Sequence, residues 1–323
     1  MNYLRDKVFM SESDIYQAIQ EIFSSKRSRV RKAVYKLAEQ SQGNEQELLQ
    51  EEVIQQLLSF VDDEDKQIRL SVLSLIQKFN LSEGLEEVLK LVKKDSSLFV
   101  REQAIKTIGK ISDQDAPKEV LNTLTTILTV SKEPTLRSAA AKALADIGNK
   151  SIVKSLITSL ASDLDCSVRD NAAEALGNLS DKRATNPLIY AIKHDSEFVV
   201  RISAIVALGK IGTSKAIDVL LDILKTDENF SNRGAACAGL AHSLDPRAID
   251  PLITVLHSDQ HAVPRRAAAL ALGELYLTFQ EEKIIDALKG CVKKEKDDSV
   301  VHNANFSLEK IRKQKSKMKL EKE

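Results

Sequence analysis

An arginine recurs at an interval of 32 residues through the central part of this chain, together with the residues around it. The stretches VRDNAAEALG, from Val168 to Gly177, and VRISAIVALG, from Val200 to Gly209, align at this offset without a gap. Self-similarity at such a period is typical of arrays in which each repeat is one small supersecondary unit. The arginines at this interval are Arg137, Arg169, Arg201, Arg233 and Arg265, and looser spacing continues the series to Arg31, Arg69 and Arg101.

Each repeat contains two segments whose apolar residues recur every three or four positions, which indicates helices. The first is amphipathic, as in AIDVLLDILKTD, and the second is the alanine-rich segment that begins near the arginine. Aromatic residues make up 4% of the chain and tryptophan is absent, which disfavours a β-sandwich. Because a short helix pair cannot bury its own apolar stripe, the pairs must stack. We therefore predict an all-α fold, a right-handed α-solenoid (superhelix) of about nine helix pairs.

The sequence predicts three regions along the chain. Residues 1–25 are expected to form an N-terminal cap, because the end of a repeat array has an atypical unit. Residues 26–311 are expected to form the solenoid. Residues 312–323 are rich in lysine, and we expect them to be a basic, disordered tail.

The overall composition excludes several classes of protein. Forty-seven basic and 47 acidic side chains cancel, so the whole chain has no field that would attract a nucleic-acid backbone. Three widely spaced cysteines without a C-x-x-C pair indicate neither a disulfide framework nor a zinc site. No stretch approaches the length of a membrane span or a signal peptide, and we expect a cytoplasmic protein.

The repeats resemble the HEAT class, and in particular the HEAT-like units of phycobiliprotein (bilin) lyases. The residues that carry this resemblance are the arginine-led helices at 168–177, 200–209 and 264–273, and the turn DPRAIDPL from Asp245 to Leu252. The resemblance implies a solenoid of HEAT-like helix pairs that attaches a linear tetrapyrrole to a cysteine of a phycobiliprotein subunit, where a thioether forms. No short motif of that family identifies the catalytic residues, so they remain unknown in this sequence.

The repeated arginines share their period with aspartates in the turns between helices. Asp163, Asp195, Asp227 and Asp259 also recur every 32 residues. A common period predicts a structural ladder, in which each aspartate caps a helix start or pairs with an arginine of its own or the adjacent repeat. We therefore do not assign these residues to catalysis.

No constellation of catalytic or metal-binding residues stands out in the sequence. None of the five histidines belongs to an H-E-x-x-H or paired His-Glu arrangement, so no metal site is predicted. A nucleophile elbow and a glycine-rich phosphate loop are also missing. Cys237 lies in a second helix at the place of Ala173 and Ile205 in other repeats, which indicates a packing residue.

The positions two, five and nine residues after each arginine lie off the apolar stripe, and we expect them to face the concave side of the solenoid. They are polar in the early repeats and become smaller and more apolar from about residue 200 onward. An apolar patch bordered by cations, here also by Lys310, suits a flat, acid-bearing ligand or a partner helix. The predicted ligand-binding residues are Ser203, Val206, Lys210, Ala235, Ala238, His242, Arg266, Leu270 and Phe306. A helix phase that differs by one residue would instead make this stripe part of the packing between repeats.

Three functions are compatible with these features. The first is a bilin lyase or lyase chaperone, whose partners would be a phycobilin and a phycobiliprotein subunit, and the resemblance also allows a second lyase subunit. The attacking thiol would belong to the substrate protein, and the tetrapyrrole would be a substrate rather than a cofactor. Whether the chain itself is an enzyme stays open. The second function is a non-catalytic adaptor that binds a protein partner in the concave groove, a common use of solenoids.

The third function is a nucleic-acid binder similar to the HEAT-like DNA glycosylases. It would need a continuous basic inner face. Such a face begins with Lys36, Lys106, Lys110 and Lys142. Asp146 and Glu174 interrupt it. We therefore expect no nucleic-acid partner.

Overall fold

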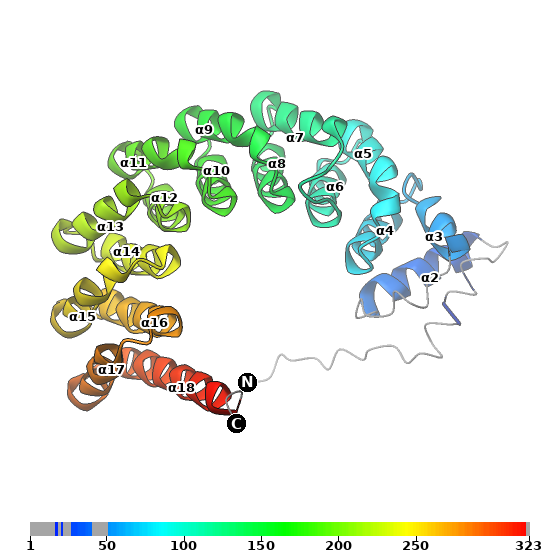
Figure 1. The fold of residues 1–323 in the computed structure, drawn as a ribbon. Coiled ribbons are helices and arrows are strands. Elements are labelled where there is room, and N and C mark those ends of the chain that lie inside the picture. Colours follow the sequence, from blue (N-terminus) through cyan, green and yellow to red (C-terminus); the bar gives the residue numbers. More distant parts are fainter. Residues whose placement is uncertain (1–16, 19–20, 22–26, 41–50, 321–323) are drawn as a thin grey trace. The chain divides into compact units, whose positions relative to one another are not determined.

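The computed structural model describes residues 17–18, 21, 27–40 and 51–320, and all regular secondary structure in these residues is helical. The chain divides into two compact units, unit 1 (Met1–Ile152) and unit 2 (Val153–Glu323). Figure 1 shows the order of the helices in each unit. None of the described helices is long and apolar enough to cross a membrane.

Unit 1 contains the first helices of the array. Its described residues also contain the short 3-10 turns Ser82–Gly84 and Lys150–Ile152. The described α-helices of unit 1 are α2 (Arg27–Gln40), α3 (Glu51–Leu58), α4 (Lys66–Lys78), α5 (Leu85–Lys94), α6 (Leu98–Ile111), α7 (Lys118–Val130) and α8 (Pro134–Ile147).

Unit 2 continues the same alternation of a first and a second helix. Asp165 and Asn229 cap second helices by accepting a hydrogen bond from the backbone N–H two residues later. Its α-helices are α9 (Val153–Ser162), α10 (Cys166–Leu179), α11 (Thr185–His194), α12 (Phe198–Ile211), α13 (Ser214–Thr226), α14 (Phe230–Ser243), α15 (Ile249–Ser258), α16 (Ala262–Phe279), α17 (Glu282–Lys294) and α18 (Asp298–Leu320).

The helices form successive pairs, and each second helix packs along the second helix of the next repeat in the same unit. In the described residues eight pairs are present: α3–α4, α5–α6, α7–α8, α9–α10, α11–α12, α13–α14, α15–α16 and α17–α18. Leucine, isoleucine, valine and alanine fill the space between the layers, and Val168, Val200 and Leu176 have no exposed surface. The predicted all-α solenoid is confirmed.

In unit 2 the second helices lie closer to one another than the first helices do. Glycine and alanine permit this approach: a Cβ at Gly209 would collide with the backbone of Gly239, and a Cβ at Gly177 would lie 2.8 Å from Ala207. The more closely spaced layer of α10, α12, α14, α16 and α18 forms the inner side of unit 2 (Figure 1). We call the exposed side of these helices the inner face.

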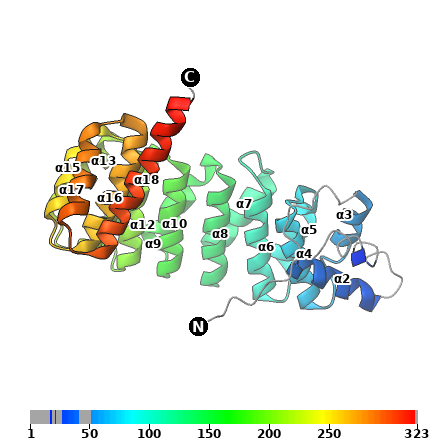
Figure 2. The ribbon, with the colours of Figure 1, turned by 90° about the horizontal axis from the view of Figure 1, so that it is seen from below.

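The expected disordered tail is wrong for most of its length, because α18 continues to Leu320. Figure 2 shows the end of this helix projecting past α16 and α17. The segment contains good helix formers and no glycine or proline, and Glu309 pairs with Lys313 one turn later at 2.8 Å. Lys315 also reaches Glu282 of α17 at 2.7 Å. Residues 321–323 and most of the predicted cap at 1–25 lie outside the described residues.

Candidate functional site

The repeated arginine connects the turn of its own repeat to the turn of the next one. Arg169 Nε and Nη2 donate to the two carboxylate oxygens of Asp195 at 2.7 and 2.9 Å. Arg169 Nη1 donates to the backbone carbonyls of Asp163 and Leu164 at 2.9 and 3.3 Å. One planar guanidinium therefore ties three backbone and side-chain groups together across a repeat boundary.

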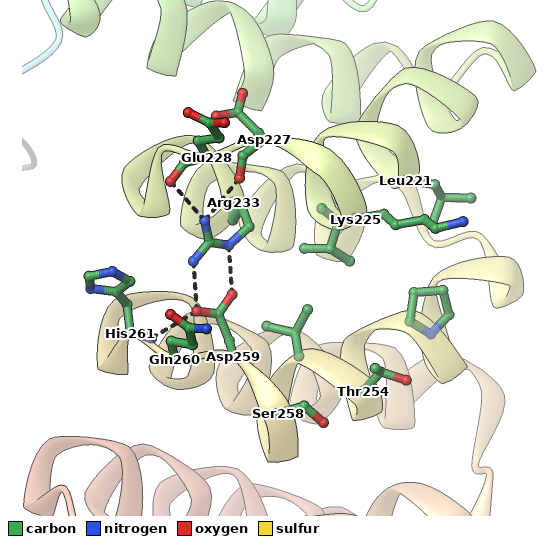
Figure 3. A pocket seen from close by; sticks show the side chains of 13 residues that line it. Leu221, Lys225, Asp227, Glu228, Arg233, Thr254, Ser258, Asp259, Gln260 and His261 are labelled. Atoms are coloured by element: carbon green, nitrogen blue, oxygen red, sulfur yellow. Dashed lines mark hydrogen bonds and ion pairs between the residues drawn. The ribbon is translucent and has the colours of Figure 1, made fainter.

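The same arrangement recurs in both units, which confirms the predicted structural ladder. Each acceptor is a carboxylate that also holds its own turn, since Asp259 accepts from the backbone N–H of His261 at 2.9 Å. We call each arginine with its carboxylate partner a rung of the ladder. Figure 3 shows the Arg233 rung, with the bonds of Arg233 to Asp259 and to the carbonyls of Asp227 and Glu228. Further bidentate rungs in the described residues include Arg31–Asp63, Arg69–Asp95 and Arg265–Glu295.

Two positions of the ladder depart from the pattern. Arg101 Nε donates to the carbonyl of Val92 at 2.9 Å, and no carboxylate of the described residues pairs with this arginine. Arg201 donates to the carbonyls of Asp195 and Ser196, as a rung does, but no carboxylate of the described chain pairs with it. Asp227, its expected partner, instead accepts from Asn232 Nδ2 at 3.0 Å. Asn232 occupies the buried place that valine takes at Val168 and Val200, so its amide needs a partner inside the fold. This residue was not singled out from the sequence, although the V-R motif changes to N-R there.

A second ladder in unit 2 joins a first helix to the next first helix or to the turn before it, and it was not predicted from the sequence. Lys215 donates to Asn186 at 2.7 Å, and Arg247 donates to Asp218 at 2.8 Å. Lys283 donates to Asp250 at 2.7 Å. The three acceptors are spaced by 32 residues, which is the signal that would have revealed them. All three pairs are solvent-exposed, so each contributes little to stability.

Acid should weaken the fold through the ladder carboxylates. Burial alone would raise the pKa of Asp195 and Asp259, but the hydrogen bonds and charges of Arg169 and Arg233 and the backbone N–H donors outweigh it. The pKa of each aspartate therefore lies below its ordinary value of 3.8. A carboxylate with a depressed folded-state pKa stabilises the fold above its unfolded pKa and loses this effect as the pH falls through the folded value.

We therefore expect the urea midpoint of the chain to be nearly constant between about pH 7 and 5 and to fall below about pH 4. Urea unfolding followed by helical circular dichroism at a series of pH values measures this. A midpoint that stays constant down to about pH 2 would contradict the role given to these carboxylates.

The clefts between first helices repeat along the chain. The cleft between α13 and α15, with a volume of about 810 Å³, has the Arg233–Asp259 rung in its wall (Figure 3). A cleft of about 750 Å³ lies between α3 and α5 of unit 1 around the equivalent Arg69–Asp95 rung. Since the two are similar in size and place, such clefts follow from the wider spacing of the first helices and do not by themselves mark a ligand site.

The structure places most of the predicted ligand-binding residues on the inner face. His242 and Arg266 are exposed, and Leu270 and Phe306 are 38% and 54% exposed. Ala235 differs, because it is buried at 8% exposure between inner helices. The remaining members are partly exposed: Ser203, Val206, Lys210 and Ala238. These positions are therefore accessible as the helix phase predicted, and their role in binding stays a prediction.

Four of these residues occupy the same position of four consecutive second helices. Val206, Ala238, Leu270 and Phe306 lie on α12, α14, α16 and α18, five residues after the arginine position. Because these helices pack side by side in this order, the four side chains form a line across the inner face. We call this line the apolar row.

Polar side chains lie one helical turn from the apolar row, four residues further along each helix. Lys210 donates to Asn178 at 2.7 Å, and Lys310 pairs with Glu274 at 2.7 Å. The charge of Lys310, which we expected to border the patch, is therefore neutralised within the chain. In the described structure the side chains of Arg266 and His242 make no hydrogen bond or ion pair. Arg266 is thus an unpaired cation one turn before Leu270.

The thiols of Cys237 and Cys291 are unsuited to nucleophilic chemistry. Both cysteines are buried, and burial raises the pKa of each thiol. Cys237 Sγ contacts the carbonyl of Pro264, in agreement with the predicted packing role. Within the described residues, no group of three or more His, Cys, Asp and Glu side chains is arranged to hold a metal ion.

Comparisons with solved structures identify the fold. The Escherichia coli protein YibA is 21% identical, with a TM-score of 0.50, over 84% of this chain and 95% of its own. Kap121p is 13% identical, with a TM-score of 0.50, over 94% of this chain and 38% of its own. The complex of CpcE and CpcF of phycocyanin lyase from Nostoc sp. PCC7120 is 25% identical, with a TM-score of 0.45, over 71% of this chain and 94% of that chain. A search of curated proteins finds no match.

The family model for HEAT repeats matches residues 51–145, 153–240 and 217–309. These segments include the arginine-led second helices of both units and both partners of most ladder rungs. The match extends over well more than half of the chain, and this protein therefore belongs to the HEAT-repeat family.

Proposed function

We propose that this chain binds a linear tetrapyrrole on the inner face of unit 2 and promotes its attachment to a cysteine of a phycobiliprotein subunit, as a bilin lyase or lyase chaperone of the cytoplasm. The observation that carries the proposal is the apolar row with the unpaired guanidinium of Arg266 beside it. A flat apolar ligand with carboxylates needs apolar surface for its rings and cations for its acids. The resemblance of the arginine-led helices to those of bilin lyases supports this ligand class.

The polar side chains around the apolar row fit the chemistry that such a reaction requires. Arg266 offers a bidentate partner for a carboxylate, and Lys210 donates to the neutral side chain of Asn178, so no acidic group compensates its charge there. His242 is an exposed imidazole on the same face, one turn after Ala238. Since Cys237 and Cys291 are buried, the attacking thiol would come from the phycobiliprotein subunit. A second lyase subunit is a further proposed partner, and no cofactor besides the pigment is required.

Replacing Arg266 by glutamine should reduce pigment transfer about tenfold or more, because a carboxylate of the pigment loses its charged partner. The test is co-expression of the chain with a bilin-producing pathway and candidate phycobiliprotein subunits, read as zinc-induced fluorescence of the subunit after denaturing electrophoresis. Lys225→Gln is the matched control, because it removes an exposed cation from α13 in the first-helix layer. Equal pigment transfer by the two variants would contradict the pairing of a pigment carboxylate with Arg266.

A non-catalytic adaptor is the second candidate, and the length of the apolar row favours it. The row crosses four helices, at a spacing of about 8–10 Å per helix. Such a surface also fits a protein segment. An adaptor would retain a protein partner without pigment. Subunits that remain unmodified with several bilins, also after a second lyase subunit is added, would favour the adaptor.

A further inference from the structure

The apolar row has a spacing that restricts what can lie along it. Its four members are on consecutive packed helices, so neighbouring members are about 8–10 Å apart. The row is therefore about 24–30 Å long from Val206 to Phe306. A partner segment that contacts all four members must place a side chain of one and the same face against the row at intervals of about 8–10 Å.

Regular backbone structures differ in whether they can do this. An α-helix rises about 10.5 Å in seven residues and completes nearly two turns, so every seventh side chain points the same way. A β-strand advances by about 10 Å in three residues, and because its side chains alternate, the third residue points to the opposite side. The row thus matches an amphipathic helix of about 20 residues better than a strand.

The charges beside the row indicate which polar residues that helix would carry. Arg266 lies one turn before Leu270, and Lys210 and His242 lie one turn after Val206 and Ala238. On these four helices the exposed acid of this border, Glu274, is already paired with Lys310. A partner whose apolar stripe is flanked by glutamate or aspartate would therefore be complementary, whereas a basic helix would face like charges.

We propose that the inner face of unit 2 binds an acidic amphipathic α-helix of a partner protein. The apolar side chains of this helix are seven residues apart, and successive ones contact α12, α14, α16 and α18. The inference rests on the proposed function in taking the inner face as the binding surface, but the helix would bind there without pigment. Leu270 and Phe306 are the main apolar contacts, because they are the largest and most exposed members of the row.

The probe is a synthetic, fluorescently labelled helix of about 22 residues with leucine at every seventh position, glutamate beside the leucines and alanine elsewhere. Its binding to the full chain is measured by fluorescence anisotropy. We expect it to bind about tenfold or more tightly than a peptide of the same composition with irregularly spaced leucines. A peptide with lysine in place of glutamate should bind more weakly by a similar factor.

Variants of the chain locate the binding surface. Leu270→Asp combined with Phe306→Asp should weaken binding about tenfold or more, because a carboxylate would be buried against an apolar stripe. Phe99→Asp is the matched control: Phe99 is 50% exposed on α6 of unit 1, and its replacement should leave binding unchanged. Helical circular dichroism shows whether each variant remains folded.

Three results would overturn the proposal: equal binding of the regular and irregular peptides, binding that survives the double replacement, or unchanged binding after prolines are placed in the middle of the peptide. The last result would identify an extended partner instead of a helical one. The peptide is measured without pigment, so the two proposals are tested separately. Absence of peptide binding together with successful pigment transfer would contradict only the helix proposal. Peptide binding without pigment transfer would remove only the lyase proposal.

Discussion

Gly209→Ala should lower the free energy of unfolding by about 3 kcal/mol, although it adds a single methyl group. The Cβ would collide with the backbone of Gly239, which cannot move away by a change of rotamer as a flexible side chain could. To accommodate it, α12 and α14 must separate, and this opens the apolar contact between two repeats. Urea unfolding of the purified chain, followed by circular dichroism, measures the change.

Gly290→Ala is the matched control for this replacement. Gly290 also lies inside a helix, α17, but an added Cβ would meet only Cε1 of His257 at 3.6 Å, an ordinary contact. Alanine should therefore stabilise the chain by about 0.5–1 kcal/mol through its higher helix propensity. If Gly209→Ala were as stable as Gly290→Ala, the close approach of α12 and α14 would be incorrect.

Arg233→Ala should destabilise the chain by about 3 kcal/mol, because it leaves the carboxylate of Asp259 buried without its partner. The two side chains are only 14% and 6% exposed, and the bond between Nε and the carboxylate is 2.6 Å long. The replacement also leaves the carbonyls of Asp227 and Glu228 without their guanidinium donor. Thermal and urea unfolding of the variant measure the loss.

Two further variants test the cause of that loss. Asp259→Asn in the Arg233→Ala background should recover part of the stability, because it removes the unpaired charge and can keep the bond from the His261 N–H. Arg183→Ala is the control, since Arg183 pairs with Asp181 at 2.8 Å but is 54% exposed, and its loss should cost less than about 1 kcal/mol. A similar cost for both arginines would mean that burial does not determine the strength of the ladder.

The period of the sequence predicted the fold and the ladder because both depend on residues that recur. An arginine and an aspartate that both recur every 32 residues occupy equivalent places in successive repeats, so a pair such as Arg169–Asp195 could be predicted. The exception at Arg201 was not predicted, because it depends on the buried amide of Asn232 and not on the arginine or the aspartate. Leu244 is a similar case, since it adopts a left-handed conformation that glycine supplies at Gly148 and Gly212.

The sequence predicted which helix positions of the inner face are accessible, but it did not predict which of the charges there are paired. Helical periodicity was sufficient to place Val206, Leu270 and Phe306 on an accessible side, because burial follows the stripe of each helix. The pairing of Lys310 with Glu274 was not foreseen, since it joins two helices whose relative register the sequence does not specify. Ala235 was assigned to the face but is buried, because the small residues at this position allow the neighbouring helix to cover it.

The most direct test of the proposed function is the titration of biliverdin, as a representative linear tetrapyrrole, into the purified chain while the visible absorbance is recorded. We predict a saturable spectral change that is lost when Leu270 and Phe306 are both replaced by aspartate and is retained in Phe99→Asp. An unchanged spectrum, or a change that persists in the double variant, would contradict tetrapyrrole binding on the inner face of unit 2.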